Sequence, residues 1–151
     1  MTFRMLAAVF LFLPGAALAQ PLAPGLRCDL GRDVTVIARL RDMPPLIRAD
    51  VERRVGDIAE PGEPFEATDA YGPVHRPLHQ FLRGLHIGQY WIVWYQHGGR
   101  GLHRHVLAYQ MGVAGDRVHQ RPAASLAANL YGDPCLATRA ILSGIRGAEE
   151  F

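Results

Sequence analysis

The clearest alternation of apolar and polar positions lies between residues 89 and 111, which read QYWIVWYQHGGRGLHRHVLAYQM. Two runs rich in aromatic and β-branched residues flank a glycine-rich centre, His97–Gly101. Runs of this composition favour strands, and a short glycine-containing connection between them is typical of a β-hairpin. The pattern therefore predicts a hairpin, and we expect the rest of the chain to be organised around it.

The register of this hairpin depends on which residues form its loop. If His97–Gly101 form the loop, Gln96 pairs with Leu102, whereas a two-residue Gly98–Gly99 turn shifts the pairing. With the longer loop, one face carries Trp91, Val93, Tyr95, His103, His105, Leu107 and Tyr109. The other face carries Tyr90, Ile92, Trp94, Leu102, Arg104, Val106 and Ala108. Both faces are largely apolar, which predicts central strands that are covered on both sides.

The segment before the hairpin predicts two strands and two helices. Apolar residues alternate over 33–40, which predicts a first strand. Apolar residues at helical spacing over 47–58 predict an amphipathic helix that Pro61–Gly62 stops. A weaker alternation over 64–71 predicts a second strand, and helical spacing over 77–85 predicts a second, short helix.

The segment after the hairpin predicts a polar loop over 112–121, followed by closing helices over 122–131 and 134–143. The predicted order of elements is typical of an α+β fold. We expect a small antiparallel sheet built around the central hairpin, with helices packed mainly on one face.

The first 19 residues match the pattern of a secretory signal peptide. Arg4 supplies a positive charge, Met5–Leu13 form a short apolar core, and Ala17–Ala19 give a small-x-small cleavage site. The apolar core is much shorter than the roughly 20 residues that a spanning helix requires. We therefore expect export to the periplasm or the outside of the cell. Residues 20–151 are expected to form a single globular domain without stable membrane insertion.

The chain contains two cysteines, Cys28 and Cys135, near the two ends of the expected mature protein. An even and minimal number of cysteines in an exported protein predicts one disulfide bond. The alternative, a cysteine metal or redox site, lacks a C-x-x-C pattern. We expect the disulfide to tie the two ends of the domain together.

Charge and motifs argue against several classes of function. Lys and Arg number 16 against 14 Asp and Glu, so the concentrated basic face of a nucleic-acid binder is not expected. The chain has no G-x-S-x-G nucleophile motif, and the hairpin glycines lead into no phosphate-binding helix. The sequence therefore favours a function other than catalysis.

Aromatic and arginine residues near the hairpin tip are candidates for recognition. Trp94, Tyr95, Arg100 and Arg104 form the combination of residue types that dominates binding hot spots. They predict an exposed patch for an envelope or extracellular protein or a glycan. The alternative interpretation places the tryptophans in the core. A role as an accessory subunit of a larger complex is equally compatible with the sequence.

The histidines of the hairpin offer an alternative function. His103 and His105 are two residues apart on a predicted strand, so both imidazoles point to the same face. With His97 as a third ligand they could bind zinc or another divalent transition metal. His79 or His86 could replace His97, and Glu66 or Asp69 could supply a carboxylate. This alternative describes a metal-binding protein or a metal-dependent enzyme, whereas the binding function requires no cofactor.

Overall fold

The structure is a computed structural model of the chain and describes residues 26, 28–31, 33–68, 75–116 and 118–147. The predicted signal peptide lies outside these residues, as does the end of the strand predicted over 64–71. The elements, in chain order, are β1 (Thr35–Ile37), the 3-10 helix η2 (Leu40–Asp42), α1 (Pro45–Val55), β2 (Ile58–Ala59), β3 (His79–Ile87), β4 (Tyr90–His97), β5 (His103–Ala114), β6 (Arg121–Tyr131) and α2 (Pro134–Leu142).

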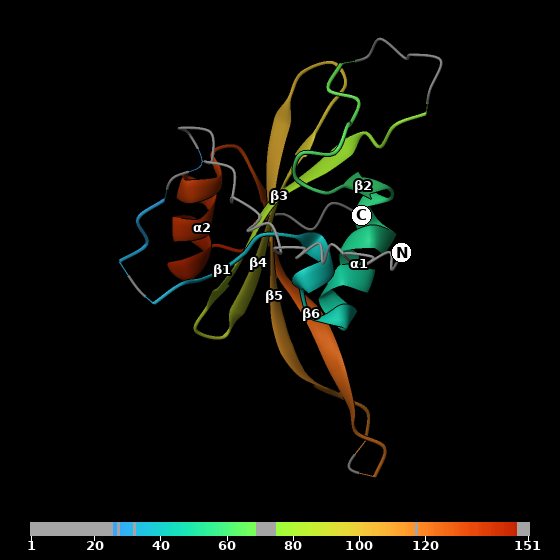
Figure 1. Ribbon diagram of the computed structural model, residues 1–151. Coiled ribbons are helices and arrows are strands. Elements are labelled where there is room, and N and C mark those ends of the chain that lie inside the picture. Colours follow the sequence, from blue (N-terminus) through green and yellow to red (C-terminus); the bar gives the residue numbers. More distant parts are fainter. Residues whose placement is uncertain (1–25, 27, 32, 69–74, 117, 148–151) are drawn as a thin grey trace, which may run out of the picture.

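Strands β3 to β6 form an antiparallel meander within a six-stranded sheet, and β6 is one of its edges. The short strand β1 pairs antiparallel with the end of β3, and β2 pairs parallel with its beginning. Figure 1 shows the sheet nearly edge-on between the two helices. The prediction of an antiparallel sheet with some helix is confirmed.

The central hairpin is present, and His97 lies opposite His103. Residues 98–102 therefore form the loop, and Gln96 pairs with Arg104 instead of with Leu102. Because the pairing partner changes by two residues, every strand side chain stays on its predicted face. Val93, Tyr95, Leu107 and Tyr109 accordingly share one core cluster, and Ile92, Trp94, Val106 and Ala108 share the other.

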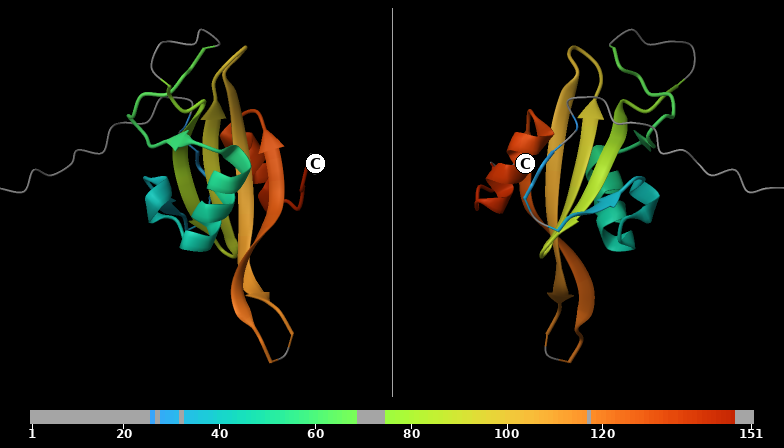
Figure 2. Two further views of the ribbon diagram at one scale, coloured as in Figure 1. Left: turned by 90° about the vertical axis from the view of Figure 1, so that its right-hand side faces the viewer. Right: turned by 60° about the vertical axis from the view of Figure 1, so that its left-hand side comes forward.

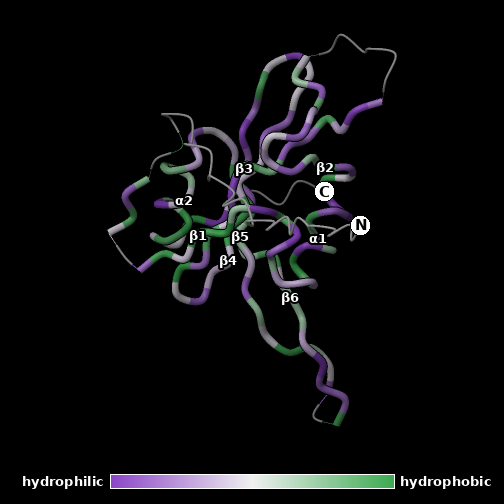
Figure 3. Tube along the Cα trace, in the orientation of Figure 1, coloured by the Kyte–Doolittle hydropathy of each residue, from purple (hydrophilic) through white to green (hydrophobic). Residues whose placement is uncertain are grey.

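The two helices cover opposite faces of the sheet (Figure 2). Ile47 and Val51 of α1 pack in the cluster of Val93, whereas Ala137 and Ile141 of α2 pack in the cluster of Trp94. The expectation that the helices pack mainly on one face is therefore wrong. The helices cover both faces because both faces of the hairpin are apolar, and each must be removed from water. Hydrophobic residues are accordingly concentrated between α1 and α2 (Figure 3).

The segments predicted as helices over 77–85 and 122–131 contribute the strands β3 and β6 instead. Each strand has one extra residue at a register shift, between Phe81 and Arg83 on β3 and between Leu126 and Ala128 on β6. A bulge reverses the alternation of faces along a strand. Phe81 therefore packs on the α1 side, whereas Leu85 packs on the α2 side. In the sequence, the four-residue spacing of Phe81 and Leu85 resembles the spacing of apolar residues along one face of a helix, although the two side chains lie on opposite faces of the sheet.

The polar loop predicted over 112–121 is mostly paired as well. β5 continues to Ala114 and β6 begins at Arg121, and their outer ends form a two-stranded arm that extends beyond the rest of the molecule (Figure 2). Residues 64–68, by contrast, form no strand.

The predicted disulfide is confirmed. Cys28 and Cys135 are bonded, with their Cα atoms 5.4 Å apart across a separation of 107 residues. The bond attaches the segment before β1 to the first turn of α2. In the described part of the chain, no helix has the length and apolar character needed to cross a membrane.

Candidate functional site

The tip of the β4–β5 hairpin brings histidines from three strands onto the α1 side of the sheet. His79 on β3 lies opposite His97 on β4, which lies opposite His103 on β5. His105 follows in the next row, opposite Tyr95. The rings of His79 and His97 are 4.6 Å apart between centroids, and His105 stacks on Tyr95 at 4.9 Å. We call these four histidines the histidine row.

His79 is the most perturbed member of the histidine row. Its pKa is lowered from 6.5 to about 4, first by burial and then by the positive charges that His97 and His105 carry when protonated, while a hydrogen bond to the Asp57 backbone raises it in part. The His79 imidazole is therefore neutral near neutral pH. Burial also raises the pKa of Tyr95 to about 12, so this phenol stays protonated.

The histidine row does not form a ready coordination sphere. No group of three or more His, Cys, Asp or Glu side chains among the described residues is arranged to hold a metal ion. His79 and His97 meet at an interplanar angle of 31°, so their rings lie nearly face to face. The metal set of His97, His103 and His105 shares one face and one end of the sheet, and its use by a metal remains a prediction.

The other ligands considered for that set are placed differently. His86 stacks on Trp91 near the β3–β4 turn, at the opposite end of β3 from His79. Glu66 lies next to the hairpin tip, where its carbonyl approaches Gly98. Asp69 lies outside the described residues.

The two aromatic residues of the predicted recognition patch are buried. Trp94 is fully buried and its indole Nε1 donates a hydrogen bond of 2.9 Å to Thr138 Oγ1 of α2. Tyr95 lies beneath the histidine row and is 8% exposed. Arg83 lies over the Trp94 ring. These placements match the interpretation that assigns the tryptophans to the core.

The two arginines of the predicted patch remain accessible. Arg100 is exposed in the hairpin loop, and Arg104 is half-buried on β5. Arg104 lines a depression of about 430 Å³, together with Leu102, His103, Tyr131, Gly132 and Asp133. The backbone of this depression is fixed, because Gly132 N–H donates to the Arg104 carbonyl at 2.9 Å. Asp133 caps α2 by accepting a hydrogen bond from Leu136 N–H.

Tyr131 is the residue that the sequence reasoning missed. It lies opposite His105 at the end of β6 and is 81% exposed, which is unusual for an aromatic ring next to a core. The sequence predicted a helix over 122–131, so it did not predict that Tyr131 lies close to the hairpin tip. Recognising residues 121–131 as a strand after β5 would have placed it there.

No protein-family model, curated protein or solved structure matches the chain.

Proposed function

We propose that the protein is an exported binding protein, closed by its disulfide, that acts without catalysis. Its partner is a protein, a glycan or another component of the cell envelope, and it binds at the tip of the β4–β5 hairpin. The observation that carries this proposal is that the highly exposed Tyr131 and the half-buried Arg104 line the same depression of about 430 Å³.

The residue types around this depression support recognition. Tyrosine and arginine are enriched at binding hot spots, because each offers a large contact area together with hydrogen-bonding groups. Leu102 adds an apolar side chain that is 52% exposed. The exposed Arg100 in the same loop extends the basic character of the surface. The hairpin tip thus presents aromatic, apolar and cationic groups side by side on a fixed backbone.

A photo-crosslinking residue in place of Tyr131 tests the proposal in living cells. We expect a crosslinked product with an envelope component, and none from the same residue in place of Val36. Val36 is 54% exposed but lies on β1, at the opposite edge of the sheet from β6. Mature protein beginning at Gln20 in the exported fraction would support export.

A double variant, Arg104→Ala with Tyr131→Ala, tests the same surface by loss of binding. We expect it to lose cosedimentation with isolated envelope fragments. The matched control, Arg48→Ala with Val36→Ala, removes the same charge and an exposed apolar side chain elsewhere, and should bind as the unmodified protein does. Equal binding by both double variants, or no crosslink at Tyr131, would contradict the proposal.

A second candidate function is binding of zinc or another divalent transition metal by the histidine row. It is favoured by the close approach of His79 and His97 and by the pairing of His97 with His103. Neutral imidazole is the form that ligates metal, and the lowered pKa of His79 maintains that form. The ring planes would have to rotate so that three nitrogens converge on one ion.

Elemental analysis and thermal unfolding with added zinc or copper test this candidate. A bound metal raises the unfolding temperature, because only the folded chain offers the assembled ligands. We expect His103→Ala to remove that increase, whereas His119→Ala, on the β5–β6 arm, should retain it. A purified protein without metal and without a thermal response to either ion would contradict metal binding.

A further inference from the structure

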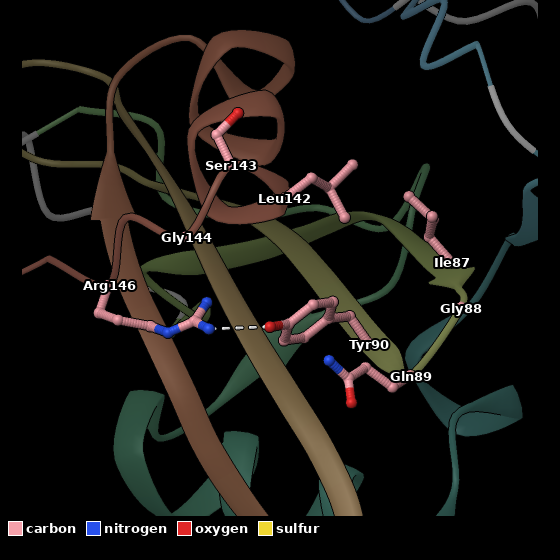
Figure 4. Close-up of a pocket in the computed structure, with 8 residues that line it drawn as sticks. All are labelled: Ile87, Gly88, Gln89, Tyr90, Leu142, Ser143, Gly144 and Arg146. Carbon is pink, nitrogen blue, oxygen red and sulfur yellow. Dashed lines mark hydrogen bonds between the residues drawn. The ribbon is translucent and has the colours of Figure 1, made fainter.

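A further depression, of about 510 Å³, lies at the end of the sheet away from the hairpin tip (Figure 4). It is bounded by the β3–β4 turn and by the residues that follow α2. Ile87 and Leu142 form its apolar wall, and Gln89, Tyr90 and Arg146 supply its polar groups. It shares no lining residue with the depression at the hairpin tip.

The backbone around Arg146 holds its side chain at this depression. Gly144 and Gly147 adopt φ values of 100° and 79°, a left-handed region that favours glycine. Between them, Ile145 N–H donates to the Ala140 carbonyl, and the Arg146 carbonyl accepts from Asn129 N–H on β6. The chain therefore leaves α2 in a fixed turn and attaches to β6 at Arg146.

The guanidinium of Arg146 lies against the phenol of Tyr90. Its Nη2 donates to the Tyr90 hydroxyl oxygen at 2.9 Å, and its Nη1 reaches the Ile141 carbonyl at 3.4 Å. Because the Tyr90 oxygen accepts this hydrogen bond, its own hydroxyl proton is left to donate. No carboxylate in the described part of the chain lies within ion-pair distance of Arg146.

Arg146 also has a structural role, since an arginine beyond the end of a helix stabilises its last carbonyls. The final turn of α2 is already well satisfied, however. The N–H groups of Ser143, Gly144 and Ile145 donate to carbonyls of that turn. A guanidinium has five N–H donors, so the hydrogen bonds to Tyr90 and Ile141 leave three for a ligand.

We propose that this depression binds a carboxylate that carries an apolar group, such as the C-terminal residue of a peptide. Arg146 and the Tyr90 hydroxyl donate to the carboxylate, and the apolar group packs against Ile87 and Leu142. The Gln89 amide lies beneath the Tyr90 ring in Figure 4, and Gln89 is exposed. This site is independent of the function proposed for the hairpin tip.

The charge of the site favours a carboxylate over a phosphate. One planar guanidinium matches a singly charged carboxylate in both geometry and charge. A doubly charged phosphate would keep one negative charge that the single guanidinium does not compensate. The apolar wall formed by Ile87 and Leu142 offers an organic ligand a contact that inorganic phosphate cannot use.

Titration with N-acetyl-leucine, followed by NMR of the backbone amides, tests this site in the purified oxidised protein. We expect saturable shifts at Gly88, Gln89 and Gly144, and none with N-acetyl-leucinamide, which lacks the charge. Equal shifts with the amide, or stronger binding of inorganic phosphate, would overturn the proposal. So would the absence of shifts at these residues at millimolar N-acetyl-leucine.

Variants separate ligand binding from the structural role of Arg146. Arg146→Gln should weaken binding of N-acetyl-leucine by about tenfold or more, the factor that a charge-assisted hydrogen bond contributes. Arg48→Gln removes an equal charge from α1 and should bind normally. If Arg146→Gln does not fold, Tyr90→Phe removes only the hydroxyl and should also weaken binding. Unchanged affinity in a folded Arg146→Gln, or in Tyr90→Phe if Arg146→Gln does not fold, would overturn the proposal.

Discussion

The indole N–H of Trp94 donates a hydrogen bond of 2.9 Å to the hydroxyl of Thr138, and both residues are fully buried. Trp94 is on the central strand β4 and Thr138 is on α2, so the bond joins the sheet to the helix that covers one of its faces. Thr138 is fully buried although its hydroxyl is polar. The pair explains why a large amphipathic ring near the hairpin tip serves the core rather than a partner.

We expect Thr138→Val to destabilise the fold. The substitution keeps the shape of the side chain but leaves the buried indole N–H without an acceptor, at a cost of about 1–3 kcal/mol in the free energy of unfolding. Urea unfolding followed by tryptophan fluorescence measures this change. Thr138→Ser keeps the acceptor and should cost only about 1 kcal/mol for the lost methyl group. A Thr138→Val protein as stable as the unmodified protein would show that the bond contributes nothing.

Loss of the disulfide is expected to destabilise the fold more strongly. Cys28 and Cys135 close a loop over 107 residues, and in the chain-entropy model such a bond contributes about 4–5 kcal/mol. The Cys28→Ser, Cys135→Ser variant should therefore unfold at much lower urea concentration. The unmodified protein should match it once reduced and should expose no free thiols before reduction. Thiol labelling of the unfolded, unreduced protein at both cysteines would contradict the bond.

The hairpin could be predicted because its pattern depends on neighbouring residues, and the disulfide because the chain contains only two cysteines. The alternation of residues on either side of Gly98–Gly99 depends only on neighbouring positions, and the pairing of Cys28 with Cys135 follows from there being two cysteines. The prediction of which residues share a face of the hairpin was also correct, because a register change of two residues leaves the faces unchanged.

The strands β3 and β6 could not be predicted in this way. The bulge between Phe81 and Arg83 reverses the alternation, so the apolar positions along β3 repeat at helical spacing. Along β6, the alanine-rich run of residues 123–128 favours helix by propensity, and only pairing with β5 makes it a strand.

The candidate sites depend on contacts between segments that are distant in the sequence. Tyr131 reaches the hairpin tip only because β6 pairs with β5, and Arg146 reaches Tyr90 only because the chain turns back after α2. His103 and Arg104, by contrast, were found from the sequence because they lie on the hairpin itself. Contacts between distant segments were therefore what the sequence alone did not provide.

We expect the stability of the fold to fall between about pH 6.5 and pH 4 because of His79. Its pKa is lowered from 6.5 to about 4 by burial and by the charges of His97 and His105 when protonated, so the unfolded chain binds a proton in this range while the folded chain does not. His79 contributes its full stability above about pH 6.5 and loses it as the pH falls. After allowance for solvent screening, the loss is about 1–2 kcal/mol.

Urea unfolding at neutral pH and near pH 4 measures this effect of His79. His79→Gln removes the titrating group, so its stability should depend less on pH than that of the unmodified protein. His75→Gln replaces an exposed histidine close by in the sequence and should behave like the unmodified protein. An NMR titration of His79 with a midpoint near 6.5 would show that folding does not lower the pKa of this histidine.

The approach of Gly98 to Glu66 gives a prediction about the loop beside the hairpin tip. A Cβ atom at Gly98 would overlap the backbone carbonyl of Glu66. Two backbone hydrogen bonds of 2.8 Å hold the segments in place, one from Gly98 N–H to the Leu78 carbonyl and one from Glu66 N–H to the Pro77 carbonyl. Gly98→Ala should therefore cost about 1–3 kcal/mol and speed hydrogen exchange at the Glu66 amide. Gly112→Ala, which adds a Cβ into open space, should change the stability by less than about 1 kcal/mol. Unchanged exchange at Glu66 in Gly98→Ala would mean that residues 64–68 do not rest on the hairpin tip.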